Sequence, residues 1–472
     1  MLPGEPPGEH DEGGANFPAS IATAGELFGL VVTTDALASA TSDRAWLLAM
    51  LRFEAALARA EADLGVVPGD AAQDIERCCY EAWDDLTPAA LGRRGRLSGN
   101  PAVPFVAELR SRLPAGSARW AHFGATSQDV LDSALMLVAR EVLDIVLADL
   151  GRLATAAAGL AERHRRDVLP ARTLLQHAAP TTFGVKAAGW LVAALEAAEA
   201  LGRLRRERLS VQLGGPAGTL AALGPRGPGV VEELARGLGL HAPVLPWHTN
   251  RLRVVELAGA LTASAGVAAK VALDVALLMQ TEVSEAFEPA APGRGGSSSL
   301  PQKRNPAMAS TVTAAWRQAQ GAASVVVGAM AQEHERAAGA WQAEHQAFSL
   351  LARSAGGAVA VAADILTGLE VDTARMEADV GLTRGLLLAE RVTLALSAHL
   401  PEPDARRIVE EASRQAAVSG TDLEGELKLD PQVAGALSKM ADDVFDPAGW
   451  VGLADVFVER ALAYYQEAKE VA

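Results

Sequence analysis

Hydrophobic positions along the chain recur mostly with the spacing of α-helices, and alternating, strand-like segments are nearly absent. Several of the helices that this pattern predicts exceed the ~8–20 residues usual in globular proteins. Helices that are apolar on most faces must be covered on most sides, so we expect an all-α protein whose long helices form a multi-subunit bundle. The predicted long helices are Asp43–Leu64, Ser127–Arg163, Thr181–Leu209, Val254–Gln280 and Pro306 to about Thr367.

Segments rich in Gly, Pro and polar residues interrupt the helical pattern at residues 97–126, 211–250 and 286–305, and each leads into a long helix. A fourth loop at 169–180 does the same, and shorter helices follow residue 368. The first residues combine Pro, Gly and acidic side chains, which is typical of disorder. We therefore predict a disordered tail (1–21), an N-terminal helical domain (22–125), a central long-helix bundle (126–367) and a C-terminal helical domain (368–472).

Composition narrows the functional classes. The formal net charge of -16 argues against non-specific nucleic-acid binding and, less strongly, against an anionic membrane surface. Glu256, Lys270 and Asp274 interrupt the apolar stretch 254–280, which predicts a buried bundle helix and not a membrane span. The N-terminus does not resemble a secretory signal, and the only cysteines, Cys78 and Cys79, are adjacent. These features favour a cytoplasmic protein.

A cationic loop at residues 293–306 stands out against the acidic background. No Asp or Glu occurs between residues 289 and 332, whereas Arg294, Lys303, Arg304 and Arg317 do. Asn305 and Pro306 fit the N-cap and first residue of a helix. The simplest explanation is an anionic ligand held by a mobile loop at a helix N-terminus.

Two further segments place polar groups at predicted helix starts. Thr126 and Asp129 fit a capping box, with Ser127 and His122 beside them, so this segment is either a simple cap or a carboxylate-binding site. Thr173, Gln176 and His177 precede Pro180, which we expect to open a helix. His177 alone would be an ordinary histidine, but the repeated arrangement of hydroxyls at helix starts makes it a candidate.

Two other polar patches, 247–251 and 332–336, complete the candidate sites. The second is expected in the middle of a helix, where His334 and Arg336 could equally form a solvated charged face. No zinc or iron motif is present in the sequence, and the phosphate-loop and nucleophile-elbow spacings are also missing.

At this point the sequence resembles the fumarase/aspartase superfamily. Residues 296–306, Gly-Ser-Ser-Ser-Leu-Pro-Gln-Lys-Arg-Asn-Pro, are similar to its signature G-S-S-x-M-P-x-K-x-N-P, with Leu300 in place of Met. Residues 124–129 and 172–180 resemble its other two characteristic regions in the same order. Within the superfamily, the bacterial 3-carboxy-cis,cis-muconate cycloisomerases are the most similar subgroup, and adenylosuccinate lyase is more distant. The supporting segments are 53–61, 99–104, 122–129, 212–223, 246–249 and 332–336.

The resemblance implies a three-domain fold and a homotetramer built around a twenty-helix core. It implies that each active site combines three regions from three different subunits, binds a small di- or tricarboxylate, and uses no metal or organic cofactor. By resemblance, the expected catalytic residues are Ser297, Lys303, Asn305 and His177. The expected substrate-binding residues are Asn100, His122, Thr126, Ser127, Gln128, Thr173, Gln176, Arg251, Ser298 and Arg336.

The family's shared step moves a proton on the carbon next to a carboxylate, through an aci-carboxylate carbanion. Such an intermediate needs prearranged cations and N–H donors, a role that Lys303, Asn305 and the loop amides fit. Ser297 is expected to transfer the proton as an alkoxide base or as the matching acid. In the cycloisomerase direction, a muconate carboxylate adds to a C=C bond of the same molecule and gives a lactone.

Several positions depart from the cycloisomerase pattern and leave the substrate open. They are Leu174, Gln302, Asn250, Gln342 and His345. The competing hypotheses are a lyase that releases an amine or nitrite from a succinyl compound to give fumarate, and a catalytically dead helical scaffold. The intact Ser297, Lys303 and Asn305 argue against the scaffold.

Overall fold

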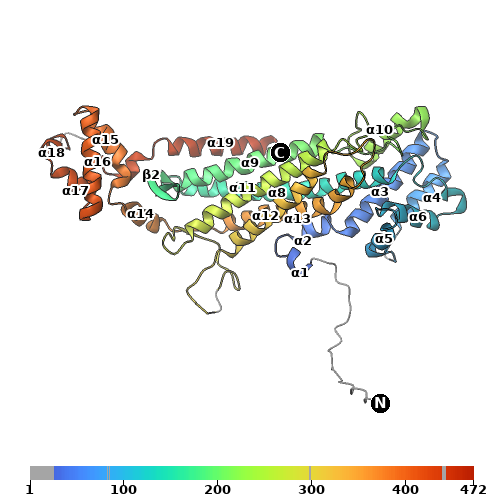
Figure 1. The fold of residues 1–472 in the computed structure, drawn as a ribbon, viewed down its shortest axis with the longest axis horizontal. Coiled ribbons are helices and arrows are strands. Elements are labelled where there is room, and N and C mark those ends of the chain that lie inside the picture. The colour runs from blue at the N-terminus through green and yellow to red at the C-terminus, as the bar shows by residue number, and fades with distance from the viewer. Residues whose placement is uncertain (1–25, 82, 84, 297–298, 438–442, 472) are drawn as a thin grey trace, which may run out of the picture.

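The computed structural model of the protein describes residues 26–471 except 82, 84, 297–298 and 438–442. The predicted tail over residues 1–21 and the candidates Ser297 and Ser298 therefore lie outside the described residues. The described part is an elongated all-α protein, as predicted, with only four short strands (Figure 1).

Five long helices form a bundle along the long axis of the molecule (Figure 1). The pairs α8 with α9, α12 with α13, and α11 with α12 pack closely, and α13 also packs on α8. A glycine lets the segment between α1 and α2 approach α13 closely. A Cβ on Gly357 would lie 2.1 Å from the Val32 carbonyl oxygen, so only glycine fits there. The five helices are α8 (Ser127–Arg163), α9 (Phe183–Glu207), α11 (Leu252–Leu278), α12 (Ala307–Gly328) and α13 (Ala340–Thr367).

Shorter helices occupy one end of the bundle (Figure 1). Helix α3 packs along α4, α8 and α10 and joins this end to the main hydrophobic core. Two of the predicted loop segments, 97–126 and 211–250, contain helices here (α6 and α10), because their apolar residues are buried against α8 and α3. The helices are α1 (Glu26–Gly29), α2 (Asp35–Ala40), α3 (Asp43–Asp63), α4 (Gly69–Tyr80), α5 (Pro88–Gly95), α6 (Ala102–Arg112), α7 (Ala115–Ala118), the 3₁₀ turn Gly224–Arg226 and α10 (Gly227–Leu238).

A small unit with its own hydrophobic core lies at the other end (Figure 1). The last helix, α19 (Ala454–Val471), leaves this unit and packs along α9 and α8, where Val458 and Ala461 join the main core. The predicted domain 368–472 therefore includes a helix that belongs with the bundle. The unit contains α14 (Thr373–Gly381), the 3₁₀ turn Leu386–Leu388, α15 (Ala389–Ser397), α16 (Glu402–Ser419), α17 (Leu423–Lys428), α18 (Pro431–Leu437) and the 3₁₀ turn Pro447–Trp450.

The prediction of one helix from Pro306 to Thr367 is wrong. The chain forms α12 and α13 with a turn between them, so residues 332–336 lie in a turn and not in mid-helix. His334 adopts φ +44° and Gly339 φ +125°, values outside the helical region. Helix α12 begins at Ala307 with Pro306 as its N-cap, one residue later than predicted.

The segment 169–180, predicted as a loop, is a β-hairpin. Strands β1 (Val168–Thr173) and β2 (Gln176–Thr182) pair antiparallel, with Val168 opposite Thr182. The expectation that Pro180 opens a helix is wrong, because Pro180 lies within β2 and α9 begins at Phe183, capped by the Thr182 hydroxyl. A second two-stranded sheet pairs β3 (Ala286–Phe287) with β4 (Glu370–Val371).

Two bundle helices, α11 and α13, have the length and apolar composition of a membrane span. Both pack within the bundle, and 72% of the most apolar window of α13 is buried there. For the corresponding window of α11 the buried share is 50%, which leaves apolar side chains such as Leu273 exposed on its outer side.

Candidate active site

The start of α8 is organised by the buried carboxylate of Asp129. The predicted capping box is present: the Thr126 amide donates to Asp129 Oδ2 at 2.9 Å. The same carboxylate accepts from the amides of Gly214 and Gly215 and from His248 Nε2 at 2.7 Å. One side chain thus fixes two distant loops against the segment that carries Thr126 and Ser127.

Arg336 lies over the two hydroxyls at this helix start. Its Nη1 donates to Thr126 Oγ1 at 2.9 Å and its Nη2 to Ser127 Oγ at 3.3 Å. All three side chains are half-buried, and burial lowers the pKa of Arg336 although Asp129 and Asp132 oppose this. Hydroxyls, a helix N-terminus and a guanidinium together can bind one carboxylate.

His122 stands in the loop just before this helix start. Its Nδ1 contacts Glu54 Oε1 at 2.6 Å, and its backbone has φ +61°. Burial disfavours the imidazolium, yet the Glu54 and Asp129 carboxylates raise the pKa of His122 above its ordinary value. The structure thus places His122 in the same region as Thr126 and Ser127.

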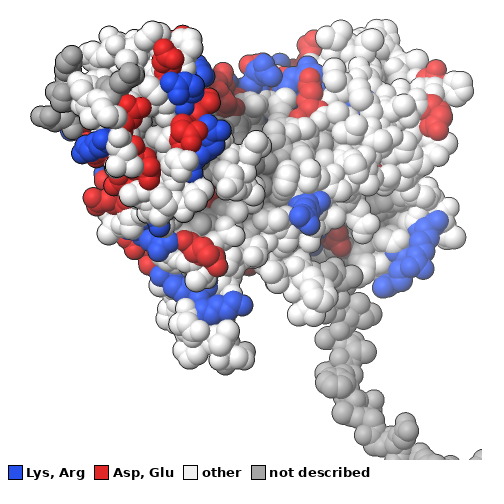
Figure 2. Space-filling model, turned by 60° about the vertical axis from the view of Figure 1, so that its left-hand side comes forward, with Lys and Arg blue, Asp and Glu red and all other residues white. Residues whose placement is uncertain are grey.

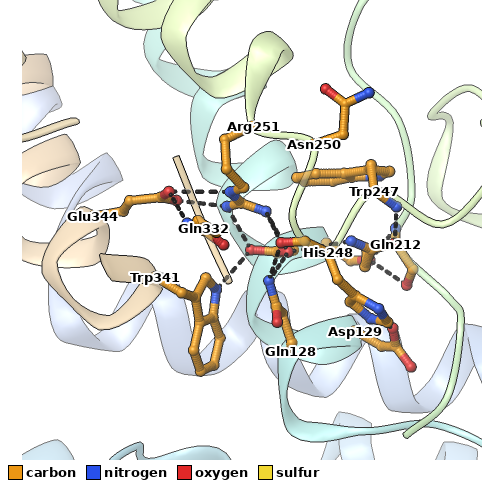
Figure 3. Close-up of polar contacts among 12 residues, drawn as sticks. Gln128, Asp129, Gln212, Trp247, His248, Asn250, Arg251, Gln332, Trp341 and Glu344 are labelled. Carbon is orange, nitrogen blue, oxygen red and sulfur yellow. Dashed lines mark hydrogen bonds and ion pairs between the residues drawn. The ribbon is translucent and has the colours of Figure 1, made fainter. Parts of the chain in front are cut away.

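Arg251, predicted to bind substrate, is instead buried at the centre of an ionic cluster (Figure 3). It pairs with Asp132 at 2.8 Å and with Glu344 at 2.5 Å, and none of its side chain is exposed. Burial opposes its charge, but the two carboxylates more than offset this and raise its pKa. The guanidinium is occupied on both sides, so a substrate-binding role does not fit this geometry.

The same cluster takes in Gln128, another predicted substrate-binding residue (Figure 3). Its side chain is fully buried, and its Nε2 donates to the His248 carbonyl at 2.7 Å and to Asp132 at 3.2 Å. Trp341 Nε1 also donates to Asp132, at 3.0 Å. Gln128 therefore ties α8 to the 247–251 segment through Nε2, whereas its buried Oε1 has no partner among the described residues. The sequence carried one unused signal of this cluster: Asp132 is the one charged residue in the mostly apolar run 130–139 of α8.

The hairpin lies at the opposite end of α8. Arg172 forms a bidentate pair with Glu285 at 2.7 and 2.8 Å, which joins the hairpin to the segment before β3. His177 is half-buried, and burial followed by the charge of Arg172 lowers its pKa. Thr173 and Gln176 are exposed near the tip. Helix α8 has 37 residues, so about 55 Å separates its two ends.

The cationic loop also lies at the hairpin end, beyond the C-terminus of α11 (Figure 1). Arg304 pairs with Glu370 at 3.1 Å and stacks on Phe287, so it anchors the loop. The Asn305 amide donates to Gly295 O at 2.9 Å and closes the neck of the loop. The Lys303 side chain is exposed and makes no hydrogen bond or ion pair with the residues that the structure describes, while the Lys303 amide donates to Leu300 O at 3.0 Å.

The expected anion site at the N-terminus of the following helix is already filled. The buried Glu288 carboxylate accepts from the amides of Met308 and Ala309 at 3.1 and 2.7 Å. An external anion therefore has no free amides there, and the loop itself carries the unpaired positive charge. Asn100 has a local role: its Oδ1 accepts from the Ala102 amide at 3.1 Å at the start of α6.

Among the described residues, no group of three or more His, Cys, Asp and Glu side chains is placed to hold a metal ion. Most of the site residues predicted from sequence fall into two sets at opposite ends of the bundle. One contains Thr126, Ser127, Arg336 and His122, and the other contains His177, Lys303 and Asn305.

Comparison with known proteins matches this architecture. A family model described as Lyase matches residues 29–321, and one described as Adenylosuccinate lyase C-terminus matches residues 385–461. The chain is 44% identical to the 3-carboxy-cis,cis-muconate cycloisomerase of Bradyrhizobium diazoefficiens, over 92% of this chain and 97% of that protein. It is 42% identical to the nitrosuccinate lyase of Streptomyces davaonensis, over 90% of this chain and 91% of that protein.

Solved structures agree. The crystal structure of 3-carboxy-cis,cis-muconate lactonizing enzyme from Pseudomonas putida superposes with a TM-score of 0.88 at 40% identity, covering 94% of this chain and 99% of that one. A fumarate lyase from Mesorhizobium superposes with a TM-score of 0.83 at 33% identity, over 92% of this chain and 98% of that one. The chain belongs to the fumarase/aspartase superfamily of lyases.

Proposed function

We propose that this protein is a 3-carboxy-cis,cis-muconate cycloisomerase of aromatic catabolism. The similarity extends over nearly the whole chain to two enzymes of that name, from Bradyrhizobium diazoefficiens and, at 45% identity, Pseudomonas aeruginosa. The observation that carries the proposal is the Arg336–Thr126–Ser127 group, a guanidinium hydrogen-bonded to two hydroxyls, which together can hold one carboxylate. A tricarboxylate substrate offers several groups of this kind.

The site is proposed to form between subunits of a homotetramer. About 55 Å of α8 separates Thr126 from the hairpin, and the 27 residues of α11 span about 40 Å towards the cationic loop. No rearrangement within one folded bundle brings these sets together. Subunits packed with their long helices antiparallel would place the Thr126 end of one beside the hairpin end of another.

Exposed apolar surface supports this assembly. Leu174 and Leu175 at the hairpin tip are 97% and 72% exposed, and apolar side chains such as Leu273 and Val325 also face outwards from the bundle. Figure 2 shows charged side chains of both signs gathered over the C-terminal unit, with broad surfaces beside it that carry few charges. Uncharged helical surfaces of this kind are suited to subunit contacts.

The proposed reaction is an isomerisation without loss of atoms. A carboxylate oxygen of the muconate adds to a C=C bond of the same molecule, the charge moves to the carbon next to a second carboxylate, and a proton then completes the lactone. Thr126, Ser127 and Arg336 hold one carboxylate in place. The Lys303 ammonium group, which has no partner among the described residues, and Asn305 stabilise the aci-carboxylate. Ser297 supplies the proton or, in reverse, removes it, while His177, Thr173 and Gln176 line the site from a second subunit.

A fumarate-forming lyase is the second candidate, because the nitrosuccinate lyase relative covers this chain almost as fully. The two reactions share the carbanion intermediate. In the cycloisomerase a lactone C–O bond forms, whereas in the lyase the bond to a leaving group breaks. Either enzyme would act on a small anionic substrate in the cytoplasm.

Spectroscopy separates the candidates. The protein is incubated with 3-carboxymuconate and, separately, with nitrosuccinate and substituted succinates. Loss of the diene absorbance with appearance of one lactone, abolished by Ser297→Ala, is the expected result. Fumarate release from a succinate without diene consumption would exclude the cycloisomerase and select the second candidate.

A further inference from the structure

A buried carboxyl group stands behind His122. Glu54 lies on α3 with a fully buried side chain, and its Oε1 lies 2.6 Å from His122 Nδ1, within hydrogen-bond distance. The pairing joins residues 68 positions apart. The neighbouring loop is held in place as well, because Arg110 donates through two nitrogens to the Ala121 carbonyl at 2.9 and 3.3 Å.

The other ring nitrogen of His122 is left available. Nε2 makes no hydrogen bond with the described residues, and it is not among their buried atoms without a partner, so it reaches the molecular surface. The side chain as a whole is only 11% exposed, so Nε2 is the ring nitrogen through which His122 can contact a ligand. The hydroxyl residues Thr126 and Ser127 follow His122 closely in the chain, separated from it by three partly buried residues.

We propose that Glu54 is a positioning residue that keeps a proton on Nδ1 of His122 and presents Nε2–H to a carboxylate of the substrate. A carboxylate behind an imidazole fixes its tautomer and orientation and favours its charged form. His122 then adds a second cation to the Arg336 group. The identity of the ligand rests on the proposed function, whereas the coupling between Glu54 and His122 does not.

The charged groups that face His122 come from three elements. Glu54 on α3 and Asp129 on α8 favour the imidazolium, and Arg110 on α6 opposes it. Glu61 lies two turns beyond Glu54 on the same helix, but its buried carboxyl oxygens contact no hydrogen-bond donor of the described residues. It is therefore a matched control: a second buried glutamate on α3 that does not touch His122.

The test measures the reactivity of His122 towards diethyl pyrocarbonate, which attacks only neutral imidazole, by peptide mass spectrometry from pH 5.5 to 8.5. His399, which is exposed, serves as the internal reference. For each histidine, the midpoint is the pH at which its reactivity reaches half of its maximum. In the unmodified protein the midpoint for His122 should lie above that of His399. Glu54→Gln should lower it by at least about one pH unit, while Glu61→Gln leaves it in place. Tricarballylate, a saturated tricarboxylate, should protect His122 and not His399.

The steady-state arm uses the diene assay. Glu54→Gln should raise KM about 10-fold or more with a smaller change in kcat, because it weakens binding of a carboxylate. A His122 midpoint at or below that of His399 in the unmodified protein would overturn the proposal, as would a midpoint unmoved by Glu54→Gln or a lack of protection by tricarballylate. The labelling midpoints are measured without catalytic turnover. A failure of the cycloisomerase assay alone would therefore contradict the proposed function and not the Glu54–His122 pair.

Discussion

Arg336 and Thr126 are 210 residues apart in sequence, yet Nη1 of one donates to Oγ1 of the other at 2.9 Å. The turn between α12 and α13 brings Arg336 to the start of α8, and Asp129 holds that start in place through four donors. The two residues are thus held together within one subunit, as the carboxylate site proposed above requires.

Arg336→Lys should reduce kcat/KM by about 10–100-fold, mainly through a higher KM. The reason is that a lysine ammonium group cannot hydrogen-bond two hydroxyls and a carboxylate in one plane, as a guanidinium can. Thermal unfolding should change little. Arg406→Lys, in an exposed pair with Glu402 on α16, is the control and should leave both quantities as they are. Unchanged kinetics in Arg336→Lys would remove Arg336 from the site.

Arg251→Met should destabilise the protein by about 3–5 kcal/mol, because it leaves the buried carboxylates of Asp132 and Glu344 without their partner. Thermal unfolding followed by circular dichroism measures this, with Arg406→Met as the exposed control. If the midpoint is unchanged while KM rises sharply, Arg251 binds substrate after all and its burial in this cluster is not its main role.

Glu61 makes stability depend on pH. Burial, with the nearby Glu54 charge, raises the pKa of Glu61 to about 9. In the unfolded chain this carboxyl ionises near pH 4.5, so between about pH 4.5 and 9 the folded state holds a proton that the unfolded state has lost. Stability therefore falls as pH rises through that window, with a slope of up to about 1.4 kcal/mol per pH unit from this group.

Glu61→Gln removes this pH-dependent loss of stability. The thermal midpoint of the variant should therefore exceed that of the unmodified protein by a margin that grows from pH 6 to pH 8.5. Glu402→Gln, in an exposed pair, should show a constant difference. A margin that stays flat or shrinks with rising pH would mean that Glu61 is ionised in the folded protein.

The long helices could be predicted from sequence because their apolar periodicity is strong. The predicted helix Ser127–Arg163 coincides with α8, and its capping box is present. The hairpin was missed because Leu174 and Leu175 form its tip with φ +49° and +65°, positions where Asn and Gly normally give the signal. The turn at 329–339 was missed because its flanking residues keep a helical composition.

The candidate site could be predicted only where residue type alone indicates chemistry. Thr126, Ser127 and His122 became candidates from a predicted cap and its neighbours, and Arg336 from resemblance, and their role in binding stays a prediction. Arg251 and Gln128 look the same in sequence as ligand-binding residues, but burial with Asp132 and Glu344 gives them a different role. Glu54 and Glu288 carry no local signal, because their partners, His122 and the start of α12, lie far away along the chain.

Mixing two inactive variants tests the central claim, a cycloisomerase site shared between subunits. Arg336→Ala changes the group at the start of α8 and Ser297→Ala changes the proposed proton-transfer residue, and each variant should be nearly inactive towards 3-carboxymuconate. After joint unfolding and refolding in equal amounts, about one quarter of the sites should combine two intact segments. We predict recovery of diene consumption towards that fraction, with none when either variant is refolded alone. A mixture as inactive as its parents, despite confirmed hybrid tetramers, would contradict the account.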